Sequence, residues 1–494
     1  MRFELLPLIL LSEKLLTMEN ILIGRQREIA ELEWAVKSDR SEFIILYGRR
    51  RVGKTFLVRK FFDDKYTFHY VGAHRQPKNL QLQNFSEALA NYSGGEVCPI
   101  ESWHDAFLQL EEYLEGCADS RKIIFFDEMP WMDSQGGEFV DELEYFWANW
   151  VQNRDDIVFI ACGSATSWMK EKLEDNQGGL HNRMTHKIYL RPFYLSECKA
   201  YLAHRGFDWS DYQILQCYMI FGGVPYYLSL LRPNLSLPEN VDSLIFRRGG
   251  DLANEMNELY NALFKNADRY MAVVKLLATK RQGFLRSEIE QATGFSGGGL
   301  SKMLDNLERC DFVVSYAQFG NRNKLTLYRL SDFYTLFYFR FVEGNRSRDE
   351  QYWLHHYTDR SVESWEGFTF EEVCLRHLAQ IKRGLGISGI ATEASSWRYV
   401  PGKGVDGKGA QIDLVIKRSD KIIHLVEMKF SESKYSITKD YANRLQERKA
   451  LFMEQTKIMR GVVLTFVTPS GIAQNSNSGI VHSQITSKEL FAEE

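Results

Sequence analysis

One eight-residue segment limits most strongly what this chain can fold into. Residues 48–55 read G-x-x-x-x-G-K-T, the spacing of a loop that wraps a phosphate group. Residues 43–47 before it are apolar and suit a buried parallel strand, and residues 56–62 after it suit a helix. Two glycines let backbone N–H groups face an anion, and the helix N-terminus adds the positive end of its dipole. The pattern predicts a nucleotide-binding loop made of Gly48, Arg49, Arg50, Arg51, Val52, Gly53, Lys54 and Thr55.

Within that loop, two side chains have predicted roles in handling the nucleotide. Lys54 is expected to reach the β- and γ-phosphates, and the Thr55 hydroxyl is expected to hold Mg²⁺. The alternative is a chance glycine-rich turn, but the flanking strand and helix favour nucleotide binding. ATP and Mg²⁺ are therefore the expected cofactors.

A second acidic motif supports this interpretation. Residues 122–128 form an apolar run that ends in Asp127 and Glu128, 73 positions after Lys54. Carboxylates at the carboxyl end of a parallel strand point into the crevice where a nucleotide binds. Asp127 is expected to act on Mg²⁺, and Glu128 to orient and activate the attacking water.

Two further polar residues are weaker candidates for the same site. Ser164 follows the apolar run 156–162 and suits a contact with the γ-phosphate or the water, although an ordinary turn serine fits almost as well. Arg183 precedes an expected strand near residues 187–190 and suits an arginine finger, acting in cis or in trans. A solvated arginine is the commoner case.

Composition limits the remaining possibilities. The 494 residues suggest about three domains, and 61 basic against 65 acidic residues give a net charge of −4, so a nucleic-acid surface must be a local patch. Seven scattered cysteines without C-x-x-C spacing argue against a disulfide framework or zinc site and fit a reducing cytoplasm.

No run approaches the ~20 apolar residues that span a bilayer. Because a second methionine stands at Met18, residues 1–17 are interpreted as an upstream extension.

Strands and helices alternate up to about residue 192, which predicts a doubly wound parallel α/β sheet. After Pro192 the pattern becomes helical. Ser196 is the expected N-cap of the first of these helices. Two glycines and a proline at 222–225 are expected to break a later helix.

At this point the chain resembles the prokaryotic AAA-type ATPases that are abundant in archaea and related to the STAND NTPases. The motifs that carry the resemblance are Gly24-Arg25, residues 48–55, Asp127-Glu128, Gly163-Ser164, Pro192-Phe193 and residues 222–225. The resemblance implies an ATPase core at 18–194, a helical lid at 195–270, and a C-terminal domain related to PD-(D/E)xK nucleases.

Residues 271–345 read as a winged helix: helix, turn, helix, hairpin. Ser287 with Glu290 is the expected capping box, and a basic turn places Arg322 and Lys324 where they suit phosphate contacts. The second helix carries few basic residues, and winged helices in such ATPases often pack within the protein. DNA contact and internal packing therefore both remain open.

The segment 355–494 carries a third constellation. Strand 411–416 contains Asp413, and the returning strand carries Glu427 and Lys429, whose spacing of two puts both on one face. This resembles a PD-(D/E)xK nuclease site, with Ile412 in place of the usual proline. The resemblance implies that Asp413 and Glu427 hold Mg²⁺, that Lys429 activates water, and that Glu371 on a helix completes the site, with Glu372 as the other choice. A strand hairpin with surface charges is the structural alternative.

Two functions follow from these patterns. The first is a cytoplasmic ATPase, able to form a homo-oligomer, whose ATP cycle is coupled to Mg²⁺-dependent action of a nuclease-like domain on DNA or RNA. The second is a nucleotide-switched interaction scaffold in which the nuclease-like domain is inactive.

Overall fold

The computed structural model describes residues 21–133, 137–164, 168–174, 180, 183–320, 326–401, 409–459 and 461–493. The chain divides into two compact units, residues 1–192 and 193–494. Each unit has its own sheets and core. Within the described residues, no helix has both the length and the apolar character needed to cross a membrane.

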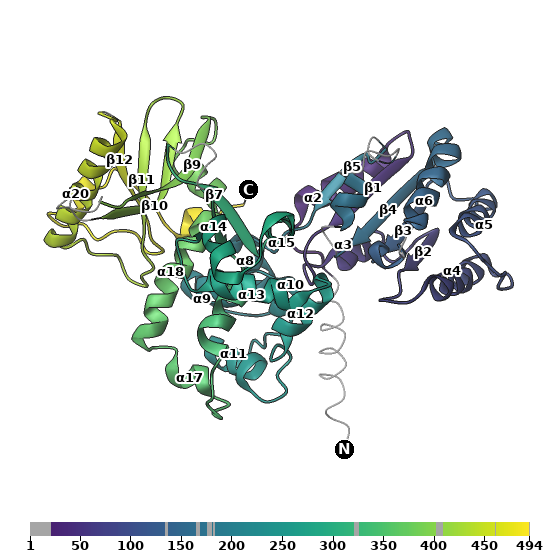
Figure 1. Ribbon diagram of the computed structural model, residues 1–494, viewed down its shortest axis with the longest axis horizontal. Helices are drawn as coiled ribbons and strands as arrows, with labels where there is room; N and C mark the ends of the chain where they lie inside the picture. Colours follow the sequence, from purple (N-terminus) through teal and green to yellow (C-terminus); the bar gives the residue numbers. More distant parts are fainter. Residues whose placement is uncertain are drawn as a thin grey trace, which may run out of the picture. The chain divides into compact units, whose positions relative to one another are not determined.

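The first unit is built on a five-stranded parallel sheet in the order β2-β3-β4-β1-β5 (Figure 1). Its strands are β1 (Glu42–Tyr47), β2 (Phe68–Val71), β3 (Lys122–Asp127), β4 (Ile157–Gly163) and β5 (His186–Tyr189). Its helices are α2 (Gln26–Lys37), α3 (Lys54–Phe61), α4 (Lys78–Ser93), α5 (Trp103–Glu115) and α6 (Glu138–Asn149), with short turns η1 (Met129–Trp131), η2 (Val151–Asn153) and η3 (Met169–Glu174). The expected parallel sheet is confirmed.

Both faces of this sheet are buried, which explains why its strands are almost continuously apolar. All six residues of β1 are buried. Phe43 and Ile45 join the core that holds α4, α5 and α6, while Ile44 and Leu46 join the core that holds α2 and α3. The sheet therefore has helices on each side, and its carboxyl edge stays open for a site.

The second unit begins with helices α8 (Leu195–His204), α9 (Asp211–Phe221), α10 (Pro225–Ser229), α11 (Leu237–Val241), η4 (Asp242–Phe246) and α12 (Glu255–Leu263). The predicted break at 222–225 is confirmed, because α9 ends at Gly222 and Pro225 starts α10. Ser196 is not the N-cap of α8. The N-cap is Tyr194, two residues earlier, and Glu197 accepts a hydrogen bond from the backbone N–H of Tyr194 at 2.9 Å.

A small three-stranded antiparallel sheet follows, in the order β6-β8-β7. It contains β6 (Phe284–Leu285), β7 (Val313–Ala317) and β8 (Thr326–Leu330), with α13 (Ala267–Ala278), α14 (Arg286–Thr293) and α15 (Gly297–Arg309). The capping box predicted for Ser287 and Glu290 is wrong by two residues, because Glu288 accepts from the N–H of Leu285 at 2.7 Å. Arg322 and Lys324 lie outside the described residues.

The larger sheet has the order β13-β12-β11-β10-β9, antiparallel from β9 to β11 and parallel from β11 to β13. Its strands are β9 (Thr392–Tyr399), β10 (Ala410–Arg418), β11 (Ile423–Met428), β12 (Val462–Val467) and β13 (Ser483–Ile485). The helices before and around it are α16 (Phe333–Phe337), η5 (Tyr338–Val342), α17 (Tyr352–His356), α18 (Arg360–Arg376), α19 (Leu378–Gly384), α20 (Lys439–Thr456), η6 (Ser478–Ile480) and α21 (Ser487–Leu490).

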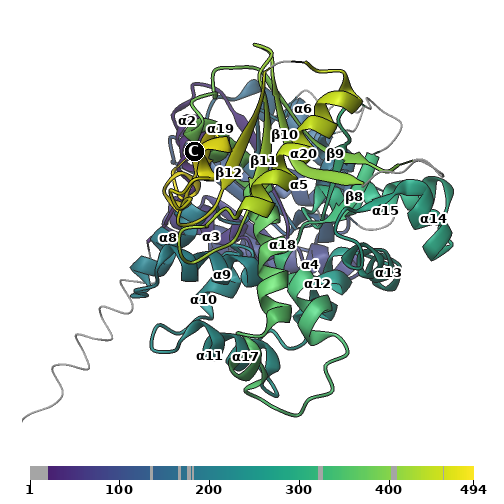
Figure 2. The same ribbon diagram turned by 90° about the vertical axis from the view of Figure 1, so that its left-hand side faces the viewer.

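Helices cover both faces of this larger sheet (Figure 2). Phe370 of α18 belongs to the core that also holds Leu414 and Val426, whereas Leu445 of α20 belongs to the core on the other face. Helix α18 ends at its C-cap residue His377, which is fully buried.

The small sheet is joined to the larger one rather than linked loosely to it. Gln318, next to β7, forms a parallel bridge with Ser396 of β9, and Phe319 donates its N–H to the Ser396 carbonyl at 2.7 Å. Phe319 also packs against Phe452 of α20, with ring centroids 5.2 Å apart. One hydrophobic core runs from Phe193 to Leu490 across the sequence boundaries expected at 270 and 345.

Candidate functional site

The phosphate loop lies where β1 ends and α3 begins. Its Gly53 precedes the first residue of α3 with φ 92°, and Arg51 also has a positive φ of 72°. An alanine Cβ at Gly48 would lie 2.3 Å from the carbonyl oxygen of Leu190, so only glycine fits where the loop passes the end of β5. The loop is therefore shaped by backbone positions that strongly favour glycine.

Two buried cations hold this loop. Lys54 is 5% exposed, and its Nζ donates to the carbonyl oxygens of Gly48 and Arg49, both at 3.0 Å. Arg25, 6% exposed, donates from Nη2 to the carbonyl of Val52 at 3.1 Å. The Gly24-Arg25 motif thus contacts the loop from the segment just before α2.

The two expected Mg²⁺ ligands are neighbours. The Thr55 hydroxyl donates to Oδ2 of Asp127 at 2.8 Å, and the other Asp127 oxygen accepts from the Glu128 N–H at 2.9 Å. Asp127 is 4% exposed at the end of β3. A hydroxyl and a carboxylate side by side are the oxygen donors that Mg²⁺ prefers, so the residues present fit this ion.

Glu128 and Ser164 contact each other at the ends of β3 and β4. The Ser164 hydroxyl lies 2.9 and 2.8 Å from the two carboxylate oxygens of Glu128. Glu128 itself has a positive φ of 46°, which places its side chain just beyond the strand. Ser164 was expected to face the γ-phosphate or the water, and the structure places it on the carboxylate predicted to activate that water.

Arg183 lies at the other edge of the sheet. Its neighbour Thr185 donates its N–H to the carbonyl of Phe43, at the amino end of β1, whereas the phosphate loop follows the carboxyl end. The Arg183 guanidinium donates to the carbonyl of Glu144 at 3.3 Å. The structure therefore does not bring Arg183 to the phosphate loop of its own chain, and only a role in trans stays a prediction.

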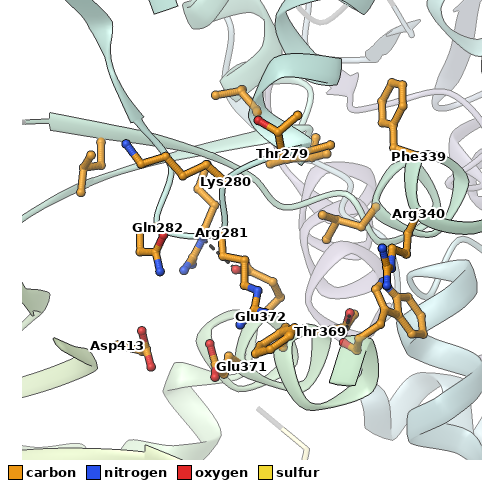
Figure 3. Close-up of a pocket in the computed structure, with 18 of the residues that line it drawn as sticks. Thr279, Lys280, Arg281, Gln282, Phe339, Arg340, Thr369, Glu371, Glu372 and Asp413 are labelled. Carbon is orange, nitrogen blue, oxygen red and sulfur yellow. Dashed lines mark hydrogen bonds and ion pairs between the residues drawn. The ribbon is translucent and has the colours of Figure 1, made fainter. Parts of the chain in front are cut away.

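A second candidate site lies wholly within the second unit. A cavity of about 560 Å³ is lined by residues of α13, the turn before β6, β7 to β9, η5, α18 and β10 (Figure 3). Glu371 of α18 and Asp413 of β10 both line it, as the nuclease-like pattern predicted. Segments far apart in sequence therefore build one chamber.

The two carboxylates in this cavity influence each other. Burial raises the pKa of Glu371 to about 8, and the nearby charge of Asp413 adds to the shift. Figure 3 shows them beside one another, with Arg281 and Gln282 on the opposite side of the cavity. Asp413 accepts one hydrogen bond, from Gln411 at 2.6 Å.

Glu427 and Lys429 are paired with each other. Lys429 Nζ lies 2.7 Å from Oε1 of Glu427, which also accepts from the Tyr441 hydroxyl, while Arg448 donates to Oε2 at 2.8 Å. Burial alone would raise the pKa of Glu427, but the charges of Lys429 and Arg448 outweigh it and lower that pKa. Both carboxylate oxygens of Glu427 are thus already bound by donors.

This arrangement bears on the predicted metal site. Among the described residues, no group of three or more His, Cys, Asp or Glu side chains is placed to hold a metal ion. Asp413 and Glu427 do not form a free pair of ligands, because Glu427 is bound by Lys429, Tyr441 and Arg448. The C-terminal residues, in this conformation, do not fit the Mg²⁺ site that the motif implied.

The structure separates the roles of Glu371 and Glu372. Glu372 lies 2.7 Å from Nε of Arg329 on β8, and the two side chains are 11% and 13% exposed. It is therefore part of an ion pair that joins α18 to the small sheet. Glu371 is the carboxylate that remains beside Asp413.

Several residues of this region carried no sequence signal. Arg281 comes from the turn between α13 and β6, and nothing in its neighbourhood marks it as part of a site. Tyr441 and Arg448 are seven apart on α20, which places them on one helix face, and that spacing was the available signal. That both side chains contact Glu427 is shown only by the fold.

Comparisons with known proteins agree with the first site. Residues 22–231 match the model of an ATPase domain found predominantly in archaea. Residues 338–443, which include Glu371, Asp413, Glu427 and Lys429, match the model of a family of archaeal and bacterial proteins of unknown function.

Two curated relatives come from Methanocaldococcus jannaschii. One, described as an uncharacterized protein, is 23% identical over 416 residues, covering 83% of this chain and 88% of its own length. The other, described as an uncharacterized ATP-binding protein, is 46% identical over 43 residues, 9% of this chain and 73% of its own.

Similar solved structures include a Walker-type ATPase of Pyrococcus abyssi and the ORC2 protein of Aeropyrum pernix. The first has a TM-score of 0.46 and 17% identity, covering 65% of this chain and 96% of that one. The second has a TM-score of 0.40 and 17% identity, covering 64% and 92%.

The glycine loop, the acidic strand end and the match over residues 22–231 define an archaeal-type P-loop ATPase domain. The protein is accordingly an enzyme that hydrolyses ATP.

Proposed function

We propose that this ATPase acts on nucleic acid through the cavity of its second unit, and that its ATP cycle controls this action. The observation that carries the proposal is the pairing of Glu371 and Asp413 in a cavity that is otherwise rich in arginine and lysine. Phosphodiesters are recognised by such cations.

In the first unit, the proposed roles follow the geometry of the loop. Lys54 leaves the carbonyls of Gly48 and Arg49 to bind the β- and γ-phosphates, and the loop N–H groups bind the phosphate oxygens. Thr55 and Asp127 would hold Mg²⁺, which would supply positive charge to neutralise the phosphates.

Glu128 is the proposed base that orients water. While both of its oxygens accept from Ser164, it is not free to do so. We therefore assign Ser164 as the residue that restrains Glu128, and release from Ser164 would free Glu128 to turn toward the water.

The second unit is proposed to be a winged helix joined to a nuclease-like domain. The order helix, helix and three-stranded sheet supports the first, and Glu371, Asp413, Glu427 and Lys429 on α18, β10 and β11 support the second. Glu427 is bound by Lys429 and Arg448, so its carboxylate is not assigned to a metal ion.

A second candidate function is favoured by that same observation. A carboxylate held by a lysine, a tyrosine and an arginine is a stable structural unit, which suits an inactive nuclease-like domain in a nucleotide-switched scaffold. The two functions differ in whether the protein cleaves nucleic acid.

The ATPase roles are tested by phosphate release from Lys54→Ala and Glu128→Gln. We expect each to lower kcat by at least ~100-fold, because each removes a group that acts on the reacting phosphate or water. Lys65→Ala removes an exposed cation that pairs with Asp63 at the surface, and it is expected to retain full activity. Normal turnover by Lys54→Ala would overturn the assignment.

Coupling is tested with DNA and RNA oligonucleotides, Mg²⁺ or Mn²⁺, with and without ATP. Cleavage that Glu371→Gln and Lys429→Ala abolish, while ATP turnover persists, supports the nuclease. Glu363→Gln, an exposed position on the same helix, is the matched control. Intact ATP turnover with no cleavage under any condition favours the scaffold.

An arginine finger in trans has its own test. Mixing Lys54→Ala with Arg183→Ala restores ATP hydrolysis if Arg183 of one subunit completes the site of the next. If the mixture stays as inactive as its components, Arg183 has only its structural contact with Glu144.

A further inference from the structure

The cavity of the second unit contains three arginines that set it apart from an ordinary surface pocket. Arg281 comes from the turn between α13 and β6, Arg340 from η5, and Arg398 from β9. All three are exposed side chains. Elements from three different parts of the sequence therefore direct guanidinium groups to one space.

The other cations of the cavity are already engaged. Lys275 lies 3.0 Å from Glu343, Lys280 lies 2.9 Å from Glu288, and Arg329 lies 2.7 Å from Glu372. By contrast, Arg281, Arg340 and Arg398 form no ion pair with any residue that the structure describes, although Arg281 and Arg340 lie over the rings of Phe368 and Phe341.

Charges of both signs act on the guanidinium of Arg281. Partial burial lowers the pKa of Arg281, and the charge of Arg340 adds a smaller effect of the same sign. Glu371 and Asp413 act in the opposite direction on Arg281. A phosphate group would neutralise the arginines, and its ester bonds would lie beside the carboxylates.

The size of the cavity limits what can enter. A volume of about 560 Å³ lies within the ~300–1,000 Å³ that enclose a single small molecule. A duplex, whose major groove alone is ~12 Å wide, does not fit into such a chamber. An unpaired strand can place one or two nucleotides there, because its bases are free to splay and to stack on aromatic side chains. Phe339 and Trp365 also line the cavity and offer such faces.

We propose that Arg281, Arg340 and Arg398 form a phosphate-binding site that admits unpaired DNA or RNA strands and excludes duplexes. This inference rests on the proposed action on nucleic acid and specifies its substrate. It also means that the small sheet and its helices contribute directly to the C-terminal site, through Arg281.

The test measures binding rather than cleavage. Fluorescence anisotropy with a labelled 12-nucleotide DNA, its RNA equivalent and the matching duplexes is recorded in EDTA, so that no metal-dependent cleavage occurs. The full-length protein is expected to bind the single strands at least ~10-fold more tightly than the duplexes. The DNA and RNA arms show which of the two strands is preferred.

The variant Arg281→Ala/Arg340→Ala/Arg398→Ala is expected to weaken single-strand binding at least ~10-fold. It is also expected to reduce the slope of log K against log salt by about 2, since each lost phosphate contact contributes ~0.7 on a single strand. The matched control, Arg346→Ala/Arg348→Ala/Arg360→Ala, removes the same charge from exposed positions outside the cavity and is expected to bind as the parent does. ATP turnover and thermal melting verify that both variants fold, and the three single variants replace the triple one if it does not.

Equal binding by the triple variant and the parent, equal binding of single strands and duplexes, or no binding at all would each overturn the inference. Cleavage that is unaffected by the triple variant would overturn it while leaving the proposed function intact. Conversely, arginine-dependent binding without cleavage under the Mg²⁺ conditions above would refute a nuclease and leave the strand-binding site.

Discussion

The two sites of this protein are built in opposite ways. In the first unit, the phosphate loop, Asp127, Glu128 and Ser164 all stand at the carboxyl edge of one parallel sheet, each at the end of a strand or directly after it. In the second unit, the cavity is enclosed by a turn, strands of two sheets and several helical segments that pack together from residues 275 to 413. One site is made by strand ends and the other by tertiary packing.

The difference has a physical consequence. A site at a sheet edge depends on the backbone path of a few loops, so it is sensitive to a single added Cβ atom. A site between packed elements depends on the contacts that hold those elements together, such as the Arg329–Glu372 pair. A substitution in the first site should therefore disturb only nearby residues. A substitution that breaks a contact between the packed elements of the second site should disturb the whole cavity.

The largest effect is expected from breaking the ion pair that joins α18 to β8. Arg329→Met leaves the buried Glu372 carboxylate without its closest partner, and we expect about 4 kcal/mol less stability of the second unit. Chemical denaturation measures this change. The unfolding transition whose midpoint added ATP does not shift is assigned to the second unit.

Two variants sharpen that prediction. Arg329→Met/Glu372→Leu should recover most of the loss, because no uncompensated charge remains. Lys417→Met removes one partner of an exposed pair with Glu393, 3.9 Å apart, and should change stability by less than ~0.5 kcal/mol. Equal losses for Arg329→Met and Lys417→Met would show that the cavity does not depend on its ion pair.

The next effect concerns the phosphate loop. Gly48→Ala places a Cβ 2.3 Å from the Leu190 carbonyl oxygen, so the loop or β5 must move, at a cost of about 3 kcal/mol to the first unit. The ATP-responsive unfolding transition reports this loss. Gly94→Ala is the matched control, since Gly94 also has a positive φ, 67°, but an added Cβ meets no atom within 4 Å, and a cost of ~1 kcal/mol is expected. A Gly48→Ala cost no larger than that of Gly94→Ala would mean that the loop tolerates the added methyl group.

The smallest effect is a pH dependence of the second unit. The pKa of Glu371 is about 8 in the folded protein, against an ordinary value of 4.5, so the folded state binds more protons between these values. Stability is therefore lost as the pH rises through this window. Glu371→Gln should match the parent at pH 4 and exceed it by about 2 kcal/mol at pH 6.

Denaturant unfolding at the two pH values measures this difference. Glu363→Gln, exposed on the same helix, should show no comparable pH dependence. If Glu371→Gln differs from the parent equally at both pH values, then Glu371 is not buried beside Asp413 as the structure shows.

Much of the first site was predictable because its residues are close to each other along single strand–loop segments. The loop 48–55 and the end of β3 are recognised from local spacing, and the parallel sheet follows from alternating apolar runs. Sequence could not show that Ser164 binds Glu128, because that contact depends on which strands are neighbours in the sheet. It also could not show that Arg183 lies at the other edge.

In the second unit, the candidate residues were predictable from the sequence, but their hydrogen bonds and ion pairs were not. Asp413, Glu427 and Lys429 were identified by spacing, but a strand pattern cannot reveal that Tyr441 and Arg448 on a later helix bind Glu427. Helix starts were also missed at Ser196 and Ser287, because α8 and α14 begin earlier, where Glu197 and Glu288 accept hydrogen bonds from the N–H groups of Tyr194 and Leu285.

The sequence by itself determined that this protein has a nucleotide loop on a parallel sheet, because glycine spacing, strand-end carboxylates and apolar periodicity are local properties. Only the tertiary structure decided that Arg281, Arg340 and Arg398 share one cavity with Glu371 and Asp413. These residues come from elements separated by up to 132 positions, and burial of the common core, rather than local spacing, brings them together.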